Sequence, residues 1–480
     1  MGENVLQNTT TKLSGQDNLT IWMLLISGFV VILNETVMSV ALPVLMREMH
    51  VDASTGQWLT TAFLLTMSVV IPITGTLIRR FATRFLYFVA MAAFMFGTIL
   101  CAAAPVFEVL LAGRIVQATG TAITMPLLIT TTISVVPAAI RGRIMGRISI
   151  VISVAPAIGP TASGFILQYF TWRWLFLFML PIVLVAVIVS FYMLCNVGEN
   201  TRVKIDLISV GFSAIGFGSV VYGLNSFGSH AATAGVSALP AVVLVTGFAA
   251  LAVFIWRQLR LQKTDSALLD LRVFRYRTYS VSVIIISISM MAMFGIIVLL
   301  PIFAQNVLEM QTLEIGLLLL PGGLIMGLVA NPVGRAVDKY GARLVMFPGV
   351  LMTSAAMWGF ALLTQNSPAW YLLLCHIVLS VGLALTFTPI FSSSMGILPK
   401  YLISHGSAIL ATMQQVAGAA GTALLVAIFA AVAGGSASAQ TNPEQVAAGA
   451  SAAFIVGVCI VTLVIVAWFY LPKREAAVAG

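Results

Sequence analysis

Long, almost uninterrupted apolar segments constrain this chain more than any other feature of its sequence. Residues 174–195 and 452–471 are two examples, and each is long enough for a helix to cross the roughly 30 Å hydrocarbon core of a bilayer. Inside lipid, backbone polar groups must be satisfied within the protein, which leaves helices or closed barrels. Barrel strands alternate apolar and polar residues over about ten positions, and these segments do not. The sequence therefore predicts an all-α integral membrane protein.

Composition supports this class. Hydrophobic residues make up 60% of the 480 residues and charged residues only 8%, whereas roughly a quarter of an ordinary soluble domain is charged. The polar N-terminal stretch lacks the basic start and cleavage site of a signal peptide, so we expect a short solvated tail. The cysteines lie far apart in apolar stretches, which favours buried thiols over disulfides or metal ligands; they are Cys101, Cys195, Cys375 and Cys459.

The distribution of basic residues fixes the number of spans and the expected orientation. If the chain has fourteen spans, all but three of the 24 Lys and Arg residues fall on the side that holds both termini. Lys and Arg accumulate on the cytoplasmic side, so we expect cytoplasmic termini in an inner or plasma membrane protein. The net charge of +9 is then topological and does not indicate nucleic-acid binding. Fourteen spans are predicted, at residues 21–42, 56–78, 85–104, 108–132, 148–170, 174–195, 207–226, 239–258, 279–301, 313–334, 344–364, 370–391, 404–432 and 451–471.

Two basic loops repeat one pattern. Residues 75–84 follow the second span and residues 334–343 follow the tenth, and their glycine, two successive charges and final Arg align without a gap. The repeat pairs span 2 with span 10. The predicted units are then a six-helix bundle at 1–200, an inserted helix pair at 201–262 and a second six-helix bundle at 263–480. Parallel six-helix repeats with a substrate site between them are a known transporter plan.

Further motifs in spans 1, 4 and 5 carry a resemblance to a known family. Arg114 lies in span 4, Gly159-Pro160 lies in span 5, and span 1 contains Leu33-Asn34-Glu35-Thr36. The chain resembles major facilitator superfamily transporters, in particular the fourteen-span drug:proton antiporters that include lincomycin-resistance exporters. The resemblance covers residues 33 to about 425 and implies the major facilitator fold. It also implies that the repeated loops latch the two bundles through Arg79, Arg80, Arg84, Asp338, Lys339 and Arg343.

The first loop departs from the family pattern, because Arg79 replaces the expected Asp and Ala82 replaces a Gly. Its latch must therefore be weaker or built differently, and the alternative is a merely topological basic loop. Span 5 resembles the family's antiporter signature, with Ala155 and Ser163 in place of two glycines. Small residues allow close helix approach and proline bends a helix, so generic packing is the alternative. The signature residues are Gly146, Ala155, Gly159, Pro160 and Gly164.

Glu35 and Arg114 are the expected proton-coupling residues. Glu35 is the only carboxylate deep within a predicted span, and Arg114 is the only basic residue deep within one. Ionisable residues inside the membrane are costly and usually functional. The family places its acid at the position of Asn34, so the shift turns the carboxylate by about 100° around the helix. A hydrogen-bonded structural Glu and a structural Arg ion pair are the alternatives.

A cavity for varied apolar substrates needs soft, adaptable side chains, which methionine supplies. The His residues show no ligand spacing and no nucleotide-binding loop is present, so we expect no metal, no cofactor other than protons, and no enzyme activity. We expect a monomer that binds lipophilic or cationic drugs.

The leading hypothesis is a proton-coupled multidrug exporter. Export of a metabolite, siderophore or amino acid is an alternative, and a non-transporting receptor or scaffold is another. The expected cavity residues are Asn34, Met38, Trp58, Gln117, Phe294, Gln305 and Gln414.

Overall fold

The computed structural model describes residues 13–51, 53–137, 140–197, 206–230, 239–433 and 442–472, and these contain helices and no strand. Fourteen helical segments in the described residues are long and apolar enough to cross a membrane, which confirms the predicted class and span number. The α-helices are α1 (Gly15–Glu48), α2 (Ala53–Arg80), α3 (Thr83–Ala103), α4 (Phe107–Val135), α5 (Arg141–Tyr169), α6 (Arg173–Leu177), α7 (Met179–Met193), α8 (Leu207–His230), α9 (Leu239–Leu261), α10 (Arg277–Asn306), α11 (Thr312–Tyr340), α12 (Ala342–Ala361), α13 (Ala369–Gly396), α14 (Lys400–Ala433) and α15 (Pro443–Phe469).

The sixth span is made of two helices. The short α6 ends at Leu177, α7 begins at Met179, and together they form the segment 173–193. Pro181 lies just inside α7. Because proline has no backbone N–H, it cannot donate to the carbonyl group of Leu177, four residues earlier. The helical hydrogen bonding is therefore interrupted here, while the apolar segment still spans the membrane.

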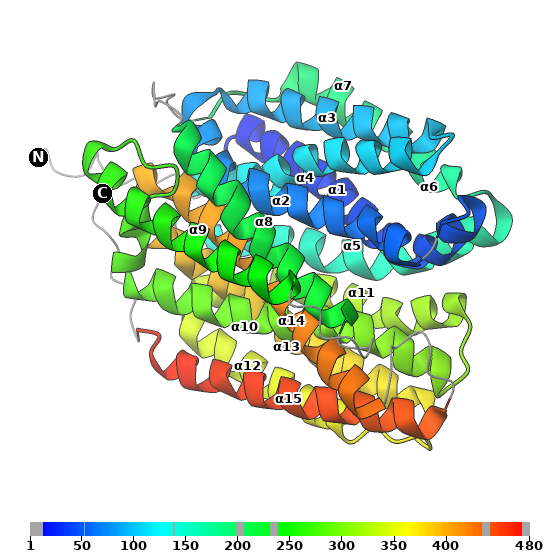
Figure 1. Cartoon of the computed structure of the whole chain (residues 1–480). Helices are drawn as coiled ribbons and strands as arrows, with labels where there is room; N and C mark the ends of the chain where they lie inside the picture. Colours follow the sequence, from blue (N-terminus) through cyan, green and yellow to red (C-terminus); the bar gives the residue numbers. More distant parts are fainter. Residues whose placement is uncertain are drawn as a thin grey trace, which may run out of the picture.

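Figure 1 shows how the helices are arranged. Helices α1 to α7 form one group, α10 to α15 form a second group, and α8 with α9 lies across them. Helices α5 and α11 run side by side where the two groups meet, and α8 packs on both α2 and α14. The boundary predicted at residue 200 lies outside the described residues, and the one at 262 falls in the 3₁₀ helix η2 (Gln262–Thr264). The division into three units remains a prediction.

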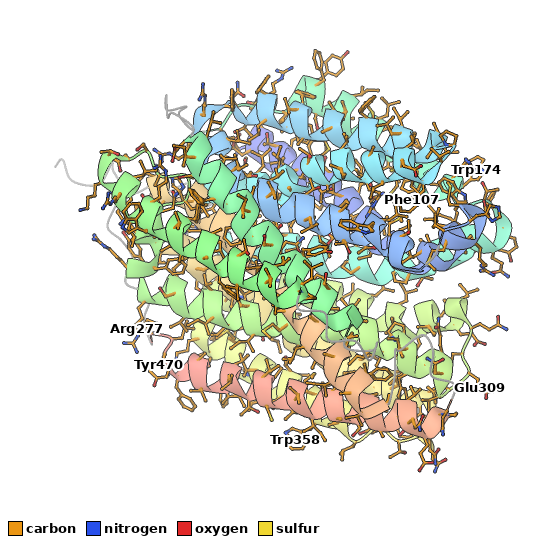
Figure 2. All side chains as sticks on the ribbon, viewed as in Figure 1. Phe107, Trp174, Arg277, Glu309, Trp358 and Tyr470 are labelled. Carbon is orange, nitrogen blue, oxygen red and sulfur yellow. The ribbon has the colours of Figure 1, made fainter. Side chains whose placement is uncertain are left out.

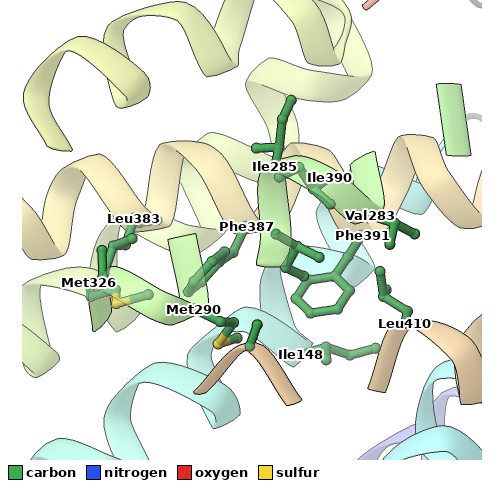
Figure 3. Close-up of a cluster of buried hydrophobic side chains, with 14 of the residues drawn as sticks. Ile148, Val283, Ile285, Met290, Met326, Leu383, Phe387, Ile390, Phe391 and Leu410 are labelled. Atoms are coloured by element: carbon green, nitrogen blue, oxygen red, sulfur yellow. The ribbon is translucent and has the colours of Figure 1, made fainter. Parts of the chain in front are cut away.

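The core contains side chains from both groups of helices. Figure 3 shows Ile148 of α5 close to Met290, Phe391 and Leu410 of the second group, and none of these four side chains is more than 3% exposed. Lipid tails are as apolar as these side chains, so association of helices in a membrane depends on close packing rather than on escape from water. The two groups are therefore held together by shape as well as by polar contacts.

The two ends of the helix bundle differ in chemistry. Figure 2 shows Arg277 and Tyr470 at one end and Phe107, Trp174 and Glu309 at the other. We call the first the basic end, because it also carries the two repeated loops at 75–84 and 334–343. The Arg277 guanidinium lies 6.0 Å from the Tyr470 ring centre. Aromatic residues of this kind favour the membrane–water interface. The assignment of the basic end to the cytoplasm stays a prediction.

Candidate functional site

Arg114 is the centre of a buried polar network between α1, α3 and α4. Only 1% of this residue is exposed. Its Nη1 donates to Asn34 Oδ1 at 2.9 Å and to Gln117 Oε1 at 2.7 Å, and its guanidinium lies 4.1 Å from the centre of the Phe63 ring. Arginine is always charged and is stabilised over an aromatic face. Two amide oxygens and one ring thus hold a cation inside the membrane-spanning part of the protein.

The network continues from Gln117 to α3. Gln117 Nε2 donates to Thr98 Oγ1 at 2.8 Å, which fixes the direction of the amide and leaves its oxygen for Arg114. Asn34 and Gln117 are only 1% and 0% exposed. We expect both to line a substrate cavity; in this structure each accepts a hydrogen bond from Arg114, and substrate contact by either stays a prediction.

Glu35 lies one residue beyond Asn34 on α1 and is half-buried. It interacts electrostatically with Arg114, yet within the described residues it makes no ion pair and no hydrogen bond. The one-residue shift explains this arrangement, because consecutive helix residues point about 100° apart. Asn34 accepts a hydrogen bond from the guanidinium, whereas Glu35 interacts with it only electrostatically. The side-chain hydrogen-bond partners of Arg114 are therefore neutral amides, and Glu35 is not among them.

The antiporter-type residues of α5 pack against two neighbours. A Cβ atom at Gly159 would lie 2.1 Å from Thr36 Oγ1, and Ser163 Oγ donates to the carbonyl oxygen of Val37 at 3.1 Å. On another face, a Cβ atom at Gly146 would lie 2.6 Å from the carbonyl oxygen of Ala330 in α11. The small residues of α5 thus permit close contact with the segment of α1 that carries Glu35 and with the second group of helices.

The other small residues of this motif differ from one another. Ala155 is fully buried, and a Cβ atom at Gly164 would be 3.7 Å from Leu313, an ordinary contact distance. Pro160 lies within the helix, as does Pro156. Close packing therefore requires glycine at residues 146 and 159 and does not require it at residue 164.

The second repeated loop, at the end of α11, is hydrogen bonded to the start of α5. The Asp338 carboxylate accepts the backbone N–H of Gly142 at 2.6 Å and that of Arg143 at 2.9 Å. These N–H groups belong to the first turn of α5, where a helix has unpaired donors and a partial positive charge. Lys339 and Arg343, by contrast, form no ion pair in the described part of the chain and lie over the rings of Tyr340 and Trp468.

The first repeated loop uses a different contact. Arg79 Nη1 lies 2.7 Å from Nε2 of His405 in α14, so this arginine connects the two groups of helices. Arg84 stays within its own group, because its Nη2 donates to the carbonyl oxygen of Phe191 at 2.6 Å. Arg80 lies over the Phe81 ring, 5.6 Å from its centre.

Further hydrogen bonds between the two groups also lie toward the basic end. Arg141 donates to the carbonyl oxygen of Gly396, and the hydroxyls of Thr130 and Ser407 lie 2.6 Å apart. Thr161, which donates to the carbonyl oxygen of Gly316 at 2.8 Å, lies nearer the opposite end. The basic end is therefore closed in this structure.

The remaining expected cavity residues do not converge on one site. Met38 is buried in an apolar cluster, and Gln305 is exposed near the end of α10. Trp58 is 41% exposed and stacks on Tyr222 of α8, with ring centres 5.8 Å apart. Phe294 packs on Gly418, and Gln414 is half-buried. Substrate contact by these five residues stays a prediction.

Sequence reasoning missed Phe63, Thr98 and His405. Phe63 and Thr98 lie in apolar runs that contain many similar residues, so no local signal distinguishes them. His405 could have been noticed as a histidine near the start of a predicted span. All four cysteines are free thiols, and the described residues contain no group of three His, Cys, Asp or Glu side chains that could hold a metal ion.

Comparison with known proteins identifies the family. The model of the Major Facilitator Superfamily matches residues 24–422. The chain belongs to the major facilitator superfamily. Its fold agrees with this assignment: the human organic anion transporter MFSD10 superimposes with a TM-score of 0.67 at 13% identity, covering 95% of this chain and 99% of that one. The proton:xylose symporter XylE gives a TM-score of 0.65 at 16% identity, covering 96% and 97%.

Several curated relatives cover nearly the whole chain. It is 38% identical to the uncharacterized transporter YcnB of Bacillus subtilis, over 94% of each chain. It is 36% identical to the lincomycin resistance protein LmrB of Listeria monocytogenes, covering 94% of this chain and 96% of that protein. It is 35% identical to LmrB of Bacillus subtilis, covering 98% and 99%. This major facilitator protein is therefore a transporter whose relatives include antibiotic-resistance proteins, and it is not an enzyme.

Proposed function

We propose that this protein is a proton-coupled exporter of structurally varied drugs, acting by alternating access as an antiporter. It would act as a monomer in the inner or plasma membrane, with both termini in the cytoplasm and with protons as its only coupling ion. The names of its LmrB relatives support drug export. Lincosamide antibiotics, or other lipophilic or cationic compounds, are then the substrate class.

The position of Glu35 is the single observation that carries proton coupling. It is a half-buried carboxylate that interacts electrostatically with Arg114 and forms no ion pair or hydrogen bond in the described residues. A proton or a cationic substrate can each neutralise that negative charge, and the two compete for it. Arg114 is held in place by Asn34 and Gln117, so its charge stays near Glu35 whichever cation is bound.

Alternating access requires the closed basic end to open and close again. The Asp338 contacts to α5 and the contact between Arg79 and His405 both join the two groups of helices. These contacts must break when the site becomes accessible from the basic end. The close contact of α5 with α1 would keep Gly159 near the Glu35 segment while the contacts between groups change.

Replacement of Glu35 by Gln tests the proposal directly. We expect Glu35→Gln to abolish drug efflux driven by a proton gradient in membrane vesicles, because glutamine has a similar shape but cannot carry the exchanged proton. Glu309→Gln is the matched control, since Glu309 is exposed at the opposite end. Full proton-driven efflux by Glu35→Gln would contradict the assignment. Efflux that persists after collapse of the proton gradient, with ATP maintained, would contradict antiport.

A resistance profile tests the substrate class. The wild-type protein and Glu35→Gln should be expressed in a drug-sensitive cell, with inhibitory concentrations measured over a broad panel that includes lincosamides. We expect the wild-type protein to raise several of these concentrations and the variant to raise none. A wild-type protein that changes none of them would favour a dedicated exporter of a metabolite, siderophore or amino acid.

A further inference from the structure

A short buried segment at the basic end belongs to neither repeated loop. Residues 267–272 follow the inserted helices α8 and α9, and residues 267–270 lie outside any helix. Ala267, Leu268, Leu269 and Asp270 are nevertheless each exposed by 3% or less. Buried backbone outside regular structure needs partners for its N–H and C=O groups. The burial of this segment therefore depends on specific hydrogen bonds from its surroundings.

Gln258 of α9 supplies part of that support. Its side chain is fully buried. Its Oε1 accepts the backbone N–H of Leu268 at 2.7 Å and that of Leu269 at 3.2 Å, while its Nε2 donates to Ser209 Oγ of α8 at 2.8 Å. One amide therefore satisfies two backbone donors and connects the segment to both inserted helices.

The inserted pair is fixed in turn at the start of α8. Ser209 Oγ donates to Asp206 Oδ2 at 2.5 Å, and Arg257 donates to both oxygens of Asp206 at 2.7 and 2.9 Å. Hydrogen bonding to this guanidinium lowers the pKa of Asp206 to about 2. Asp206 therefore stays charged near neutral pH. The hydrogen bonds that run from Asp206 through Ser209 to Gln258 fix the segment to α8 and α9.

The segment also contacts both groups of helices. Thr76 of α2 donates through Oγ1 to the carbonyl oxygen of Leu268 at 3.0 Å. Arg272 bonds the Asp270 carboxylate, with Nε 2.8 Å from Oδ2, and its guanidinium lies 5.7 Å from the ring centre of Tyr401 in α14. Asp270 interacts electrostatically with His405, the partner of Arg79, and the more exposed Asp265 interacts electrostatically with both residues. Residues 267–272 therefore lie where α2 meets α14.

We propose that residues 267–272 form a third latch of the basic end, held by the inserted helix pair, and that Asp270 supplies the acid that the first repeated loop lacks. This role depends on the alternating-access transport proposed above. Helix α8 packs on both α2 and α14 (Figure 1), so the inserted pair bridges the two helices whose separation would open this end. Positions 267–272 hold the closed state through Thr76 and through the charge of Asp270.

A cysteine reporter measures the separation of α2 from α14 without any substrate. Ala408 of α14 is fully buried, and its Cβ would lie 3.2 Å from a Cβ at Gly75 of α2. Ala408→Cys, in a protein whose four native cysteines are replaced, should react slowly with a maleimide added from the basic side. Separation of α2 from α14 exposes this position and raises the rate of labelling.

Thr76→Val should raise the labelling rate about two- to tenfold, because it removes one buried hydrogen bond of the closed state. Thr74→Val is the matched control: Thr74 is equally buried, but its hydroxyl bonds only Val70 within α2. Equal rates for the two variants would overturn the latch. Because labelling needs no transported drug, a failure of drug export in the wild-type protein leaves this result interpretable.

The role of Asp270 has its own matched pair. Asp270 and Asp265 both pair with Arg272, but their side chains are 3% and 70% exposed. We expect Asp270→Asn to raise the labelling rate at least as much as Thr76→Val. Asp265→Asn should raise it less, because the exposed charge of Asp265 is screened by solvent. Thermal unfolding of both variants, measured in parallel, separates opening from misfolding. Unchanged labelling in a folded Asp270→Asn protein would overturn the assignment of this acid.

Discussion

The two repeated loops occupy equivalent places in the two groups of helices, yet they close the basic end by different chemistry. In the loop at 334–343, a carboxylate accepts two N–H groups at the start of α5. In the loop at 75–84, a guanidinium lies against a histidine inside α14. The first contact is a charge at a helix terminus, and the second joins two side chains. An internal repeat can therefore conserve the place of a contact while exchanging the groups that make it.

The turn geometry of the loops differs in the same way. Gly341 has φ of 84° and ψ of 155° at the junction of α11 and α12, a region that is essentially restricted to glycine. Ala82, at the equivalent place before α3, has φ of −60° and ψ of 140°, which any residue adopts. The replacement of the family glycine by Ala82 thus accompanies a different path of the chain and is not a strained version of the same turn.

Removal of the carboxylate should produce the largest effect. Asp338→Asn retains one acceptor and places an NH₂ group against the second N–H of α5, so we expect the closed state to lose about 2 kcal/mol, or roughly thirtyfold in the closed-to-open ratio. The measurement is maleimide labelling of Ala330→Cys, because Ala330 is buried in α11 and its carbonyl faces Gly146 of α5. Arg335→Gln, an exposed charge one turn earlier, is the control. Similar labelling in both variants would show that Asp338 does not hold α11 against α5.

The contact between Arg79 and His405 should have a smaller effect. A double-mutant cycle with Arg79→Ala and His405→Ala, read by labelling of Ala408→Cys, should give a coupling energy of about 1 kcal/mol. The coupling is smaller than for Asp338 because a neutral imidazole nitrogen is a weaker partner for a cation than a carboxylate is for helix N–H groups. Additive single variants would mean that the two side chains are neighbours without being a latch.

Features of the fold and site can be predicted from sequence when the pattern that indicates them lies within one short stretch of the chain. Span number follows from apolar length and from the alternation of Arg and Lys, both of which are local patterns, and the structure confirms it. The family resemblance of the loop motif likewise indicates Asp338 as a latch residue, since the acid and its place in the pattern lie in one stretch of chain. These features need no knowledge of which helices are neighbours.

The site itself depends on contacts between distant residues, which are harder to predict from sequence. The sequence does not predict that Asn34 and Gln117 both hydrogen bond Arg114. His405 was passed over because its partner lies 326 residues away in the chain. Which face of a helix meets which neighbour is decided by packing, and a single sequence contains no direct record of it.

Exchange of the two turn residues should have the smallest effect and tests whether the loops differ in backbone as well as in chemistry. Gly341→Ala should destabilise the protein by about 1 kcal/mol, because alanine rarely adopts the backbone angles of this residue. Nothing lies within 4 Å of the added Cβ, so the cost comes from backbone strain alone. Ala82→Gly should cost only about 0.5 kcal/mol, from added freedom of the unfolded chain. Thermal unfolding of the purified variants measures both. A larger loss for Ala82→Gly than for Gly341→Ala would mean that the first loop depends on a packed alanine side chain, and the contrast between the two turns would then lie in side-chain contacts instead of backbone conformation.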